Sequence, residues 1–152
     1  MRYICTLLFL VMTGAGSVNA ETAGRVSYVG GTLESLNSGA GGSILTADRD
    51  VLTVRIGKRD TEVPYERINL VEYGQNASRR IVMAVVVSPL FLLAKSRRHF
   101  LTIGFQDSDN RQQAMVLRVD KGKIRAVLAS LEARTGLRIH YQDDEARKSG
   151  RG

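Results

Sequence analysis

The feature that most constrains the fold is a series of short alternating segments followed by one amphipathic helix. Residues 51–56 alternate between apolar and polar side chains, which is the pattern of a strand with one buried face. A turn at residues 57–60 and a return strand at 61–63 complete a hairpin. Pro64 ends it, because proline cannot donate a hydrogen bond to a strand ladder.

Similar patterns predict further extended segments on both sides of this hairpin. The glycine-rich stretch at residues 38–42 is interpreted as a loop, because it lacks the Lys-Ser/Thr ending of a phosphate-binding loop. A turn-rich loop around residues 106–110 joins the last two long strands into a second hairpin. The expected strands are residues 27–36 with an interruption at Gly30-Gly31, a short piece from Ile44, residues 69–73, residues 100–105 and residues 114–119.

One helix is predicted near the C-terminus. Asp120 is a suitable N-cap for a helix that runs to about Arg134, and Gly136 is a natural stop. Residues 137–141 are interpreted as a last short strand, and the polar tail 143–152 is expected to fray. The apolar stripe of the helix consists of Ile124, Val127, Leu128 and Leu131.

This order predicts an α+β protein that is mainly β. We expect about six or seven short strands in a strongly bent antiparallel sheet or partly open barrel, which the C-terminal helix closes. The domain organisation expected from the sequence is a signal peptide at 1–20, a single domain at 21–142 with an apolar insertion at 81–94, and a polar tail at 143–152.

The N-terminal segment has the layout of a secretory signal peptide. Arg2 precedes an uncharged apolar run at residues 4–12, and the small residues Val18 and Ala20 predict cleavage before Glu21. An uncleaved anchor helix is the alternative, but a membrane span needs about 20 apolar residues. We therefore expect an exported protein that is periplasmic or associated with the cell envelope, with secretion as the alternative.

Charge and cysteine content limit the classes of function. The formal net charge of the 152-residue chain is +7, which favours acidic surfaces such as anionic lipid headgroups as partners; maintenance of solubility is the simpler explanation. The single cysteine, Cys5, lies in the signal segment, so the exported part has no thiol chemistry. Tryptophan is absent and aromatic residues do not alternate with basic ones, which argues against a nucleic-acid partner.

Residues 81–94 form an uncharged apolar run that permits three interpretations. As a helix it would be about 21 Å long, which is short of the about 30 Å of hydrocarbon in a bilayer, and Pro89 would kink it. It could instead enter one leaflet while the flanking cations bind headgroups, each contributing about 1 kcal/mol. It could also be ordinary core or an oligomer interface.

The basic flanks favour a contact with a membrane or a partner. Neither His99 nor His140 has a second ligand at metal-binding spacing, and His99 is interpreted as a surface residue that contacts headgroups. The acidic residues near 107–109 are interpreted as solvated turn residues. The residues expected at the contact are Arg79, Arg80, Leu90, Phe91, Leu92, Lys95, Arg97, Arg98 and His99.

Five stretches carry a resemblance to known proteins. They are residues 28–33 (YVGGTL), 63–68 (VPYERI), 70–74 (LVEYG), 95–103 (KSRRHFLTI) and 131–136 (LEARTG). Together they resemble a family of small, uncharacterised exported bacterial proteins with a pleckstrin-homology or GRAM-like domain. The resemblance implies a bacterial source and supports the fold and the location, and it brings no reaction with it.

The sequence therefore predicts a non-catalytic exported binding module without a cofactor or a metal. Its partner would be an anionic membrane surface or an envelope protein, reached through residues 81–94 and their basic flanks. The alternative is a soluble structural or assembly protein of the envelope that uses the apolar segment as core or as the interface of a homo-oligomer. A third interpretation is an enzyme with a hidden site, which a polar pocket with converging side chains would favour.

Overall fold

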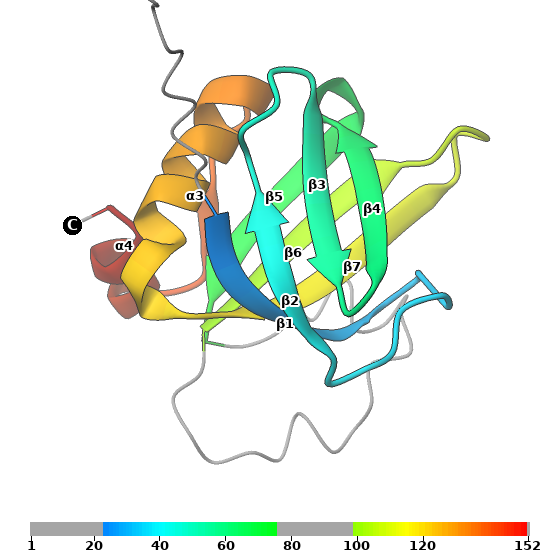
Figure 1. Ribbon diagram of the computed structural model, residues 1–152. Coiled ribbons are helices and arrows are strands. Elements are labelled where there is room, and N and C mark those ends of the chain that lie inside the picture. Colours follow the sequence, from blue (N-terminus) through cyan, green and yellow to red (C-terminus); the bar gives the residue numbers. More distant parts are fainter. Residues whose placement is uncertain (1–22, 76–98, 152) are drawn as a thin grey trace, which may run out of the picture.

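The computed structural model describes residues 23–75 and 99–151 (Figure 1). The first part of this chain forms an antiparallel meander in which each strand pairs with the next. Its strands are β1 (Ala23–Gly31), β2 (Gly41–Leu45), β3 (Val51–Ile56) and β4 (Arg59–Pro64). The predicted hairpin of β3 and β4 is confirmed, with Gly57 at a φ of 60° in its turn.

The second part of the sheet is built from strands that return to β1. The short 3-10 helix η1 (Tyr65–Arg67) leads into β5 (Ile68–Gly74), which pairs with β6 (His99–Gln106), which in turn pairs with β7 (Gln112–Val119). Strand β7 then pairs with β1, so that β1 joins both halves. The result is one open sheet with the strand order β4-β3-β2-β1-β7-β6-β5-β8.

The prediction of a mainly β protein is confirmed, but the strand number of six or seven is wrong. The described residues form eight strands, and the last of them, β8 (His140–Tyr141), lies within the predicted segment 137–141 and pairs in parallel with the outer edge of β5. Two boundaries also differ from the prediction. Strand β1 begins at Ala23 and ends at Gly31, and β2 already begins at Gly41, inside the stretch interpreted as a loop.

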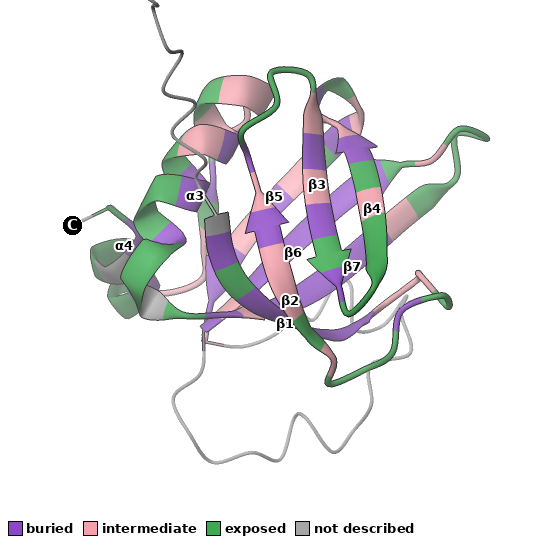
Figure 2. Cartoon of the chain, in the orientation of Figure 1, coloured by how far each residue is buried: buried purple, intermediate pink, exposed green. Residues whose placement is uncertain are grey.

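Helix α3 (Lys121–Thr135) supplies the apolar face that the sheet needs to form a core. It contacts β1 and η1, and its side chains Ile124, Val127, Leu128 and Leu131 are at most 2% exposed. Figure 2 shows the buried residues concentrated on the strands and on the inner side of this helix. Each such side chain contributes about 1.5–3 kcal/mol when fully buried. The predicted apolar stripe is confirmed.

The end of α3 follows the sequence prediction. Gly136 adopts the left-handed conformation with φ 69°, and its N–H donates to the carbonyl oxygen of Glu132. Asp120 stands at the N-cap position, although its side chain makes no capping hydrogen bond. Glycine suits this C-cap position because it has no Cβ, so a positive φ causes little steric strain.

The expected frayed tail is instead a second helix, α4 (Asp144–Arg151), which packs against α3 and β5. Ala146 is fully buried, and its N–H donates to the Oδ1 atom of Asp143 at 2.6 Å. Gly150 packs closely on the ring of Tyr141, where an added Cβ would lie 2.5 Å from a ring carbon. The tail therefore has buried contacts that its polar composition does not indicate.

Candidate functional site

Most of the residues predicted to contact a membrane or partner lie outside the described residues. The structure describes the two ends of the chain that flank them, at Gln75 and His99. The predicted contact residues outside the described chain are Arg79, Arg80, Leu90, Phe91, Leu92, Lys95, Arg97 and Arg98. Their role stays a prediction.

His99 is the one predicted contact residue that the structure describes, and it lies inside the protein. Its side chain is 2% exposed, because it alternates onto the core face of β6 together with Leu101 and Ile103. Its ring stacks on Tyr73 with a centroid distance of 5.5 Å, and its Nδ1 atom lies 2.9 Å from the Tyr73 hydroxyl. The interpretation of His99 as a surface residue is therefore wrong.

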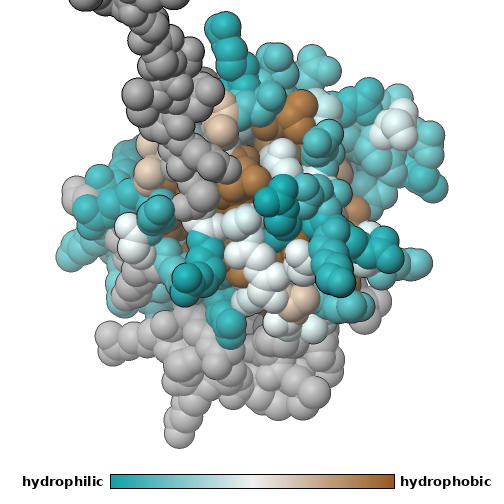
Figure 3. Space-filling model, viewed as in Figure 1, coloured by the Kyte–Doolittle hydropathy of each residue, from teal (hydrophilic) through white to brown (hydrophobic). Residues whose placement is uncertain are grey.

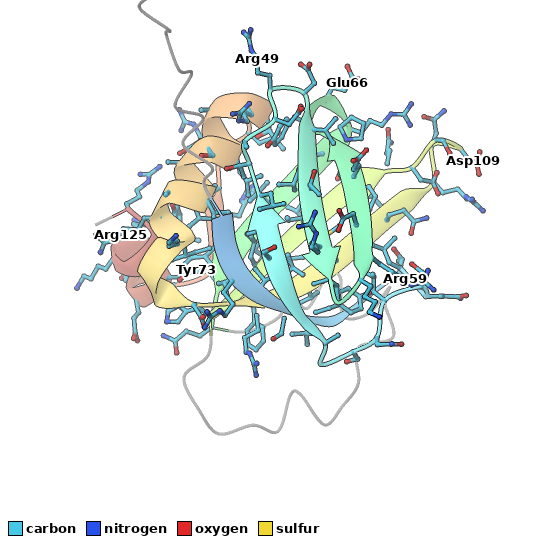
Figure 4. All side chains as sticks on the ribbon, in the orientation of Figure 1. Arg49, Arg59, Glu66, Tyr73, Asp109 and Arg125 are labelled. Atoms are coloured by element: carbon cyan, nitrogen blue, oxygen red, sulfur yellow. The ribbon has the colours of Figure 1, made fainter. Side chains whose placement is uncertain are left out.

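Tyr73 anchors this buried cluster, which lies beside α3 and α4 (Figure 4). It is fully buried, and burial raises the pKa of its hydroxyl to about 12. The ring of Tyr141 meets it edge-on at 6.3 Å, so Tyr73 connects β5, β6 and β8. A neutral hydroxyl at this position can exchange a hydrogen bond with the imidazole but has no access to solvent, which fits a structural role.

The opposite face of β6 and β7 carries a second set of buried side chains. Thr102 and Val116 are Cα partners, and both alternate with residues of the main core, so they point to the other side of the sheet. They are 1% and 0% exposed, respectively. Phe100 and Leu70 lie half-buried on the same face. Thr102 and Val116 are therefore buried on the side of the sheet that faces away from α3, which is also the side that carries Arg118.

A pocket of about 310 Å³ opens where β1, β2 and β7 meet. Arg25 and Ser27 line it from one face of β1, and Arg118, the Cα partner of Ser27, lines it from β7. Arg25 is exposed and Arg118 is half-buried. The carboxylate-bearing residue at its rim is Asp120, whose N–H donates to the Arg25 carbonyl oxygen at 3.4 Å.

Three glycines from the β1–β2 connection and from β2 line the pocket together with Val26. They are Gly39, Gly41 and Gly42. Gly41 is the Cα partner of Ser27, and a Cβ added to Gly41 would meet nothing within 4 Å. Gly42 is different, because its Cβ would lie 1.8 Å from the Arg55 carbonyl oxygen. The hollow therefore exists because a strand position opposite Ser27 carries no side chain.

The acidic residues of the β6–β7 connection stabilise the turn, and Asp107 does so by accepting hydrogen bonds from backbone N–H groups. Oδ1 of Asp107 accepts hydrogen bonds from the N–H groups of Asp109 and Arg111, both at 2.9 Å. Arg111 also forms ion pairs with both carboxylates. These hydrogen bonds hold the pKa of Asp107 below its usual value, with the backbone N–H of Arg111 as the largest cause. The interpretation of these acids as turn residues is confirmed.

Within residues 23–75 and 99–151, no three His, Cys, Asp or Glu side chains are grouped so that they could hold a metal ion. In the same part of the chain, no helix has both the length and the apolar character needed to cross a bilayer. On the face seen in Figure 3, hydrophobic colour is confined to small areas between hydrophilic side chains.

Comparison with known proteins adds no identification. The sequence matches no family model, and no curated protein or solved structure matches it.

Sequence reasoning missed the pocket residues Arg25, Ser27 and Arg118. Alternation places Arg25 and Ser27 on the same side of β1, and this signal was available. The sequence does not indicate that residue 118 pairs with residue 27, because that pairing depends on the return of β7 to β1.

Proposed function

We propose that this protein is a non-catalytic binding module of the bacterial cell envelope. It contacts an anionic membrane surface or a membrane-bound partner through residues 81–94 and the basic residues on either side. The observation that carries the proposal is the length of the connection that contains these residues.

Strands β5 and β6 are antiparallel neighbours, and Gly74 and Phe100 are Cα partners at the ends that the connection joins. Hairpin connections at such a position usually take about 2–5 residues, whereas here residues 75–98 intervene. Long connections in compact domains are often functional, because the paired strands do not need them. The apolar run and its flanking cations therefore form an addition to a sheet that is already paired.

The flanking charges suit an anionic surface. Two arginines precede the apolar run, and Lys95, Arg97 and Arg98 follow it. Each cation near an anionic leaflet contributes about 1 kcal/mol, so the five together contribute about 5 kcal/mol in addition to the burial of the apolar run. His99 has no part in this contact, because it is buried against Tyr73.

The arrangement of the sheet supports a pleckstrin-homology-like architecture. Strand β1 belongs to both the β1–β4 meander and the β5–β7 meander, and α3 follows the last long strand and covers the core. We extend the proposal to this fold group on strand order and on the position of the helix, with β8 and α4 as additions.

Co-sedimentation with vesicles tests the membrane contact. The protein is expected to sediment with vesicles of phosphatidylglycerol and phosphatidylcholine, and much less with phosphatidylcholine alone. Neutralising Arg79, Arg80, Lys95, Arg97 and Arg98 to glutamine should abolish the difference. The matched control neutralises five exposed cations elsewhere, Arg49, Lys58, Arg59, Lys123 and Arg138. Equal sedimentation with both vesicle types, or equal losses in the two variants, would refute the contact.

A second candidate function is a soluble structural or assembly protein of the envelope. Thr102 and Val116 are buried on the side of the sheet that faces away from α3, and this favours it, because burial there suits an apolar segment that serves as core. Analytical ultracentrifugation without detergent distinguishes the two functions. A stable oligomer that dissociates when residues 81–94 are replaced by a Gly/Ser linker would support assembly, whereas a monomer that binds vesicles would exclude it.

A further inference from the structure

We propose that the pocket between β1, β2 and β7 is a binding site for a singly charged phosphodiester group. All of the residues that define it belong to the described part of the chain, and the proposal does not depend on the membrane contact proposed above. Its defining residues are Arg25, Ser27 and Arg118, with Asp120 at the rim and Gly41 in the wall.

The donors come from two neighbouring strands. Arg118 lies directly across from Ser27, and Arg25 lies two residues from Ser27 on the same face of β1. Two guanidinium groups from different strands can each face one of the two non-bridging oxygens of a phosphodiester, and the Ser27 hydroxyl adds a third donor. A carboxylate also presents two oxygens to a guanidinium, so acetate is the comparison ligand in the test below.

The charge of the pocket matches a monoanion. Among the described residues, no ion pair joins Arg25 or Arg118 to an acidic side chain. Asp120 at the rim offsets one of the two positive charges, so the pocket carries one net positive charge. A phosphodiester monoanion neutralises this charge, whereas a phosphomonoester dianion leaves one negative charge in excess and is repelled by Asp120 twice as strongly as a monoanion.

The space in the pocket suits a small polar group. Its volume of about 310 Å³ lies at the lower end of the range of about 300–1,000 Å³ for ligand sites. The room is left by Gly41, opposite Ser27, where a Cβ would meet nothing within 4 Å. Backbone groups of the glycine wall can approach a bound ester closely, because no side chain intervenes.

Titration of the purified protein with glycerophosphoglycerol, a soluble phosphodiester, tests the site. Chemical-shift changes in a ¹⁵N-labelled sample should be saturable and centred on residues 25–27, 39–42 and 118–120. Arg118→Gln should weaken binding about tenfold, and the more exposed Arg25→Gln up to about fivefold. Gly41→Leu should block binding while it leaves every charge in place.

The control is Arg49→Gln, which removes the same charge from an exposed position at the edge of the molecule shown in Figure 4. It should leave the affinity unchanged, and the circular dichroism spectra of all variants should match that of the parent protein. Asp120→Asn should strengthen the binding of inorganic phosphate more than that of the diester, because it removes the repulsion of a dianion. A purely structural role of Asp120 would not produce that difference.

A vesicle-binding experiment distinguishes two sources of the diester, a lipid headgroup and a soluble ligand. The first measurement uses the variant in which residues 79, 80, 95, 97 and 98 are neutralised. If this variant still binds phosphatidylglycerol vesicles, and adding Gly41→Leu removes that binding, the ligand is a lipid headgroup. Binding of the soluble diester without such residual vesicle binding identifies a soluble ligand. The proposal would be overturned by chemical-shift changes that do not saturate or that acetate reproduces equally. Chemical-shift changes that persist in both Arg118→Gln and Gly41→Leu would also overturn it.

Discussion

Replacement of Val116 by alanine measures whether the outer face of β6 and β7 is a real second core. Val116 is fully buried on that face, and Val54 is fully buried in the main core. Both substitutions remove two carbon atoms, at about 0.8 kcal/mol per buried CH₂ plus a contribution from the cavity. We therefore expect Val116→Ala and Val54→Ala to lower the free energy of unfolding by a similar amount, about 1.5–3 kcal/mol.

Val51→Ala is the matched control for this comparison. Val51 lies half-buried in β3, so its substitution shares the loss of strand propensity but removes little buried surface. We expect a loss of at most about 0.5 kcal/mol for this variant. Urea unfolding followed by circular dichroism is the suitable assay, because the protein contains no tryptophan.

If Val116→Ala lowers the free energy of unfolding no more than Val51→Ala does, the outer face is open in solution and the argument from its burial fails. Repeating the measurement with residues 81–94 replaced by a Gly/Ser linker distinguishes the two proposed functions. If the cost of Val116→Ala then falls below about 0.5 kcal/mol, the apolar segment covers this face, and the structural alternative gains over membrane contact.

Three further predictions concern titratable and hydrogen-bonded groups. Tyr73→Phe removes the hydrogen bond to His99 and should lower the free energy of unfolding by about 1 kcal/mol; an unchanged urea midpoint would contradict a structural role for this pair. Burial raises the pKa values of Tyr28 and Tyr73 to about 12, so stability should be complete below pH 10 and decrease as the pH rises from about 10 to 12. Absorbance titration of phenolate in the folded protein checks this, and ionisation of all tyrosines near pH 10 without unfolding would refute it. Because the pKa of Asp107 is lowered, Asp107→Asn should reduce the melting temperature at pH 7, and the difference from the parent protein should shrink as the pH falls through the range where Asp107 is protonated. Equal differences at neutral and acidic pH would contradict the turn role of its carboxylate.

Local patterns were sufficient for several elements. The β3–β4 hairpin follows from alternation around a glycine turn, and α3 follows from its apolar stripe and its stop at Gly136. These features depend on neighbours close in sequence, which is why one chain segment can determine them.

Other features depend on partners far away in the sequence. His99 follows a basic stretch and reads as a surface residue, yet the register of β6 against β5 and β7 places it beside Tyr73 in the core. The helix α4 has a polar sequence, and it is held by the burial of Ala146 and by the packing of Gly150 on Tyr141 of β8, which pairs with β5.

The sequence by itself determined the mainly β character, the hairpins, the C-terminal helix and the presence of an apolar run between basic flanks. Only the tertiary structure decided which strands meet, and therefore where charges gather. Arg25 and Arg118 share a pocket because β7 crosses back to β1, and a register shift of one residue would point Arg118 to the opposite face. Long-range register is set by the packing of apolar side chains from the strands and α3 into one core, and no local pattern encodes it.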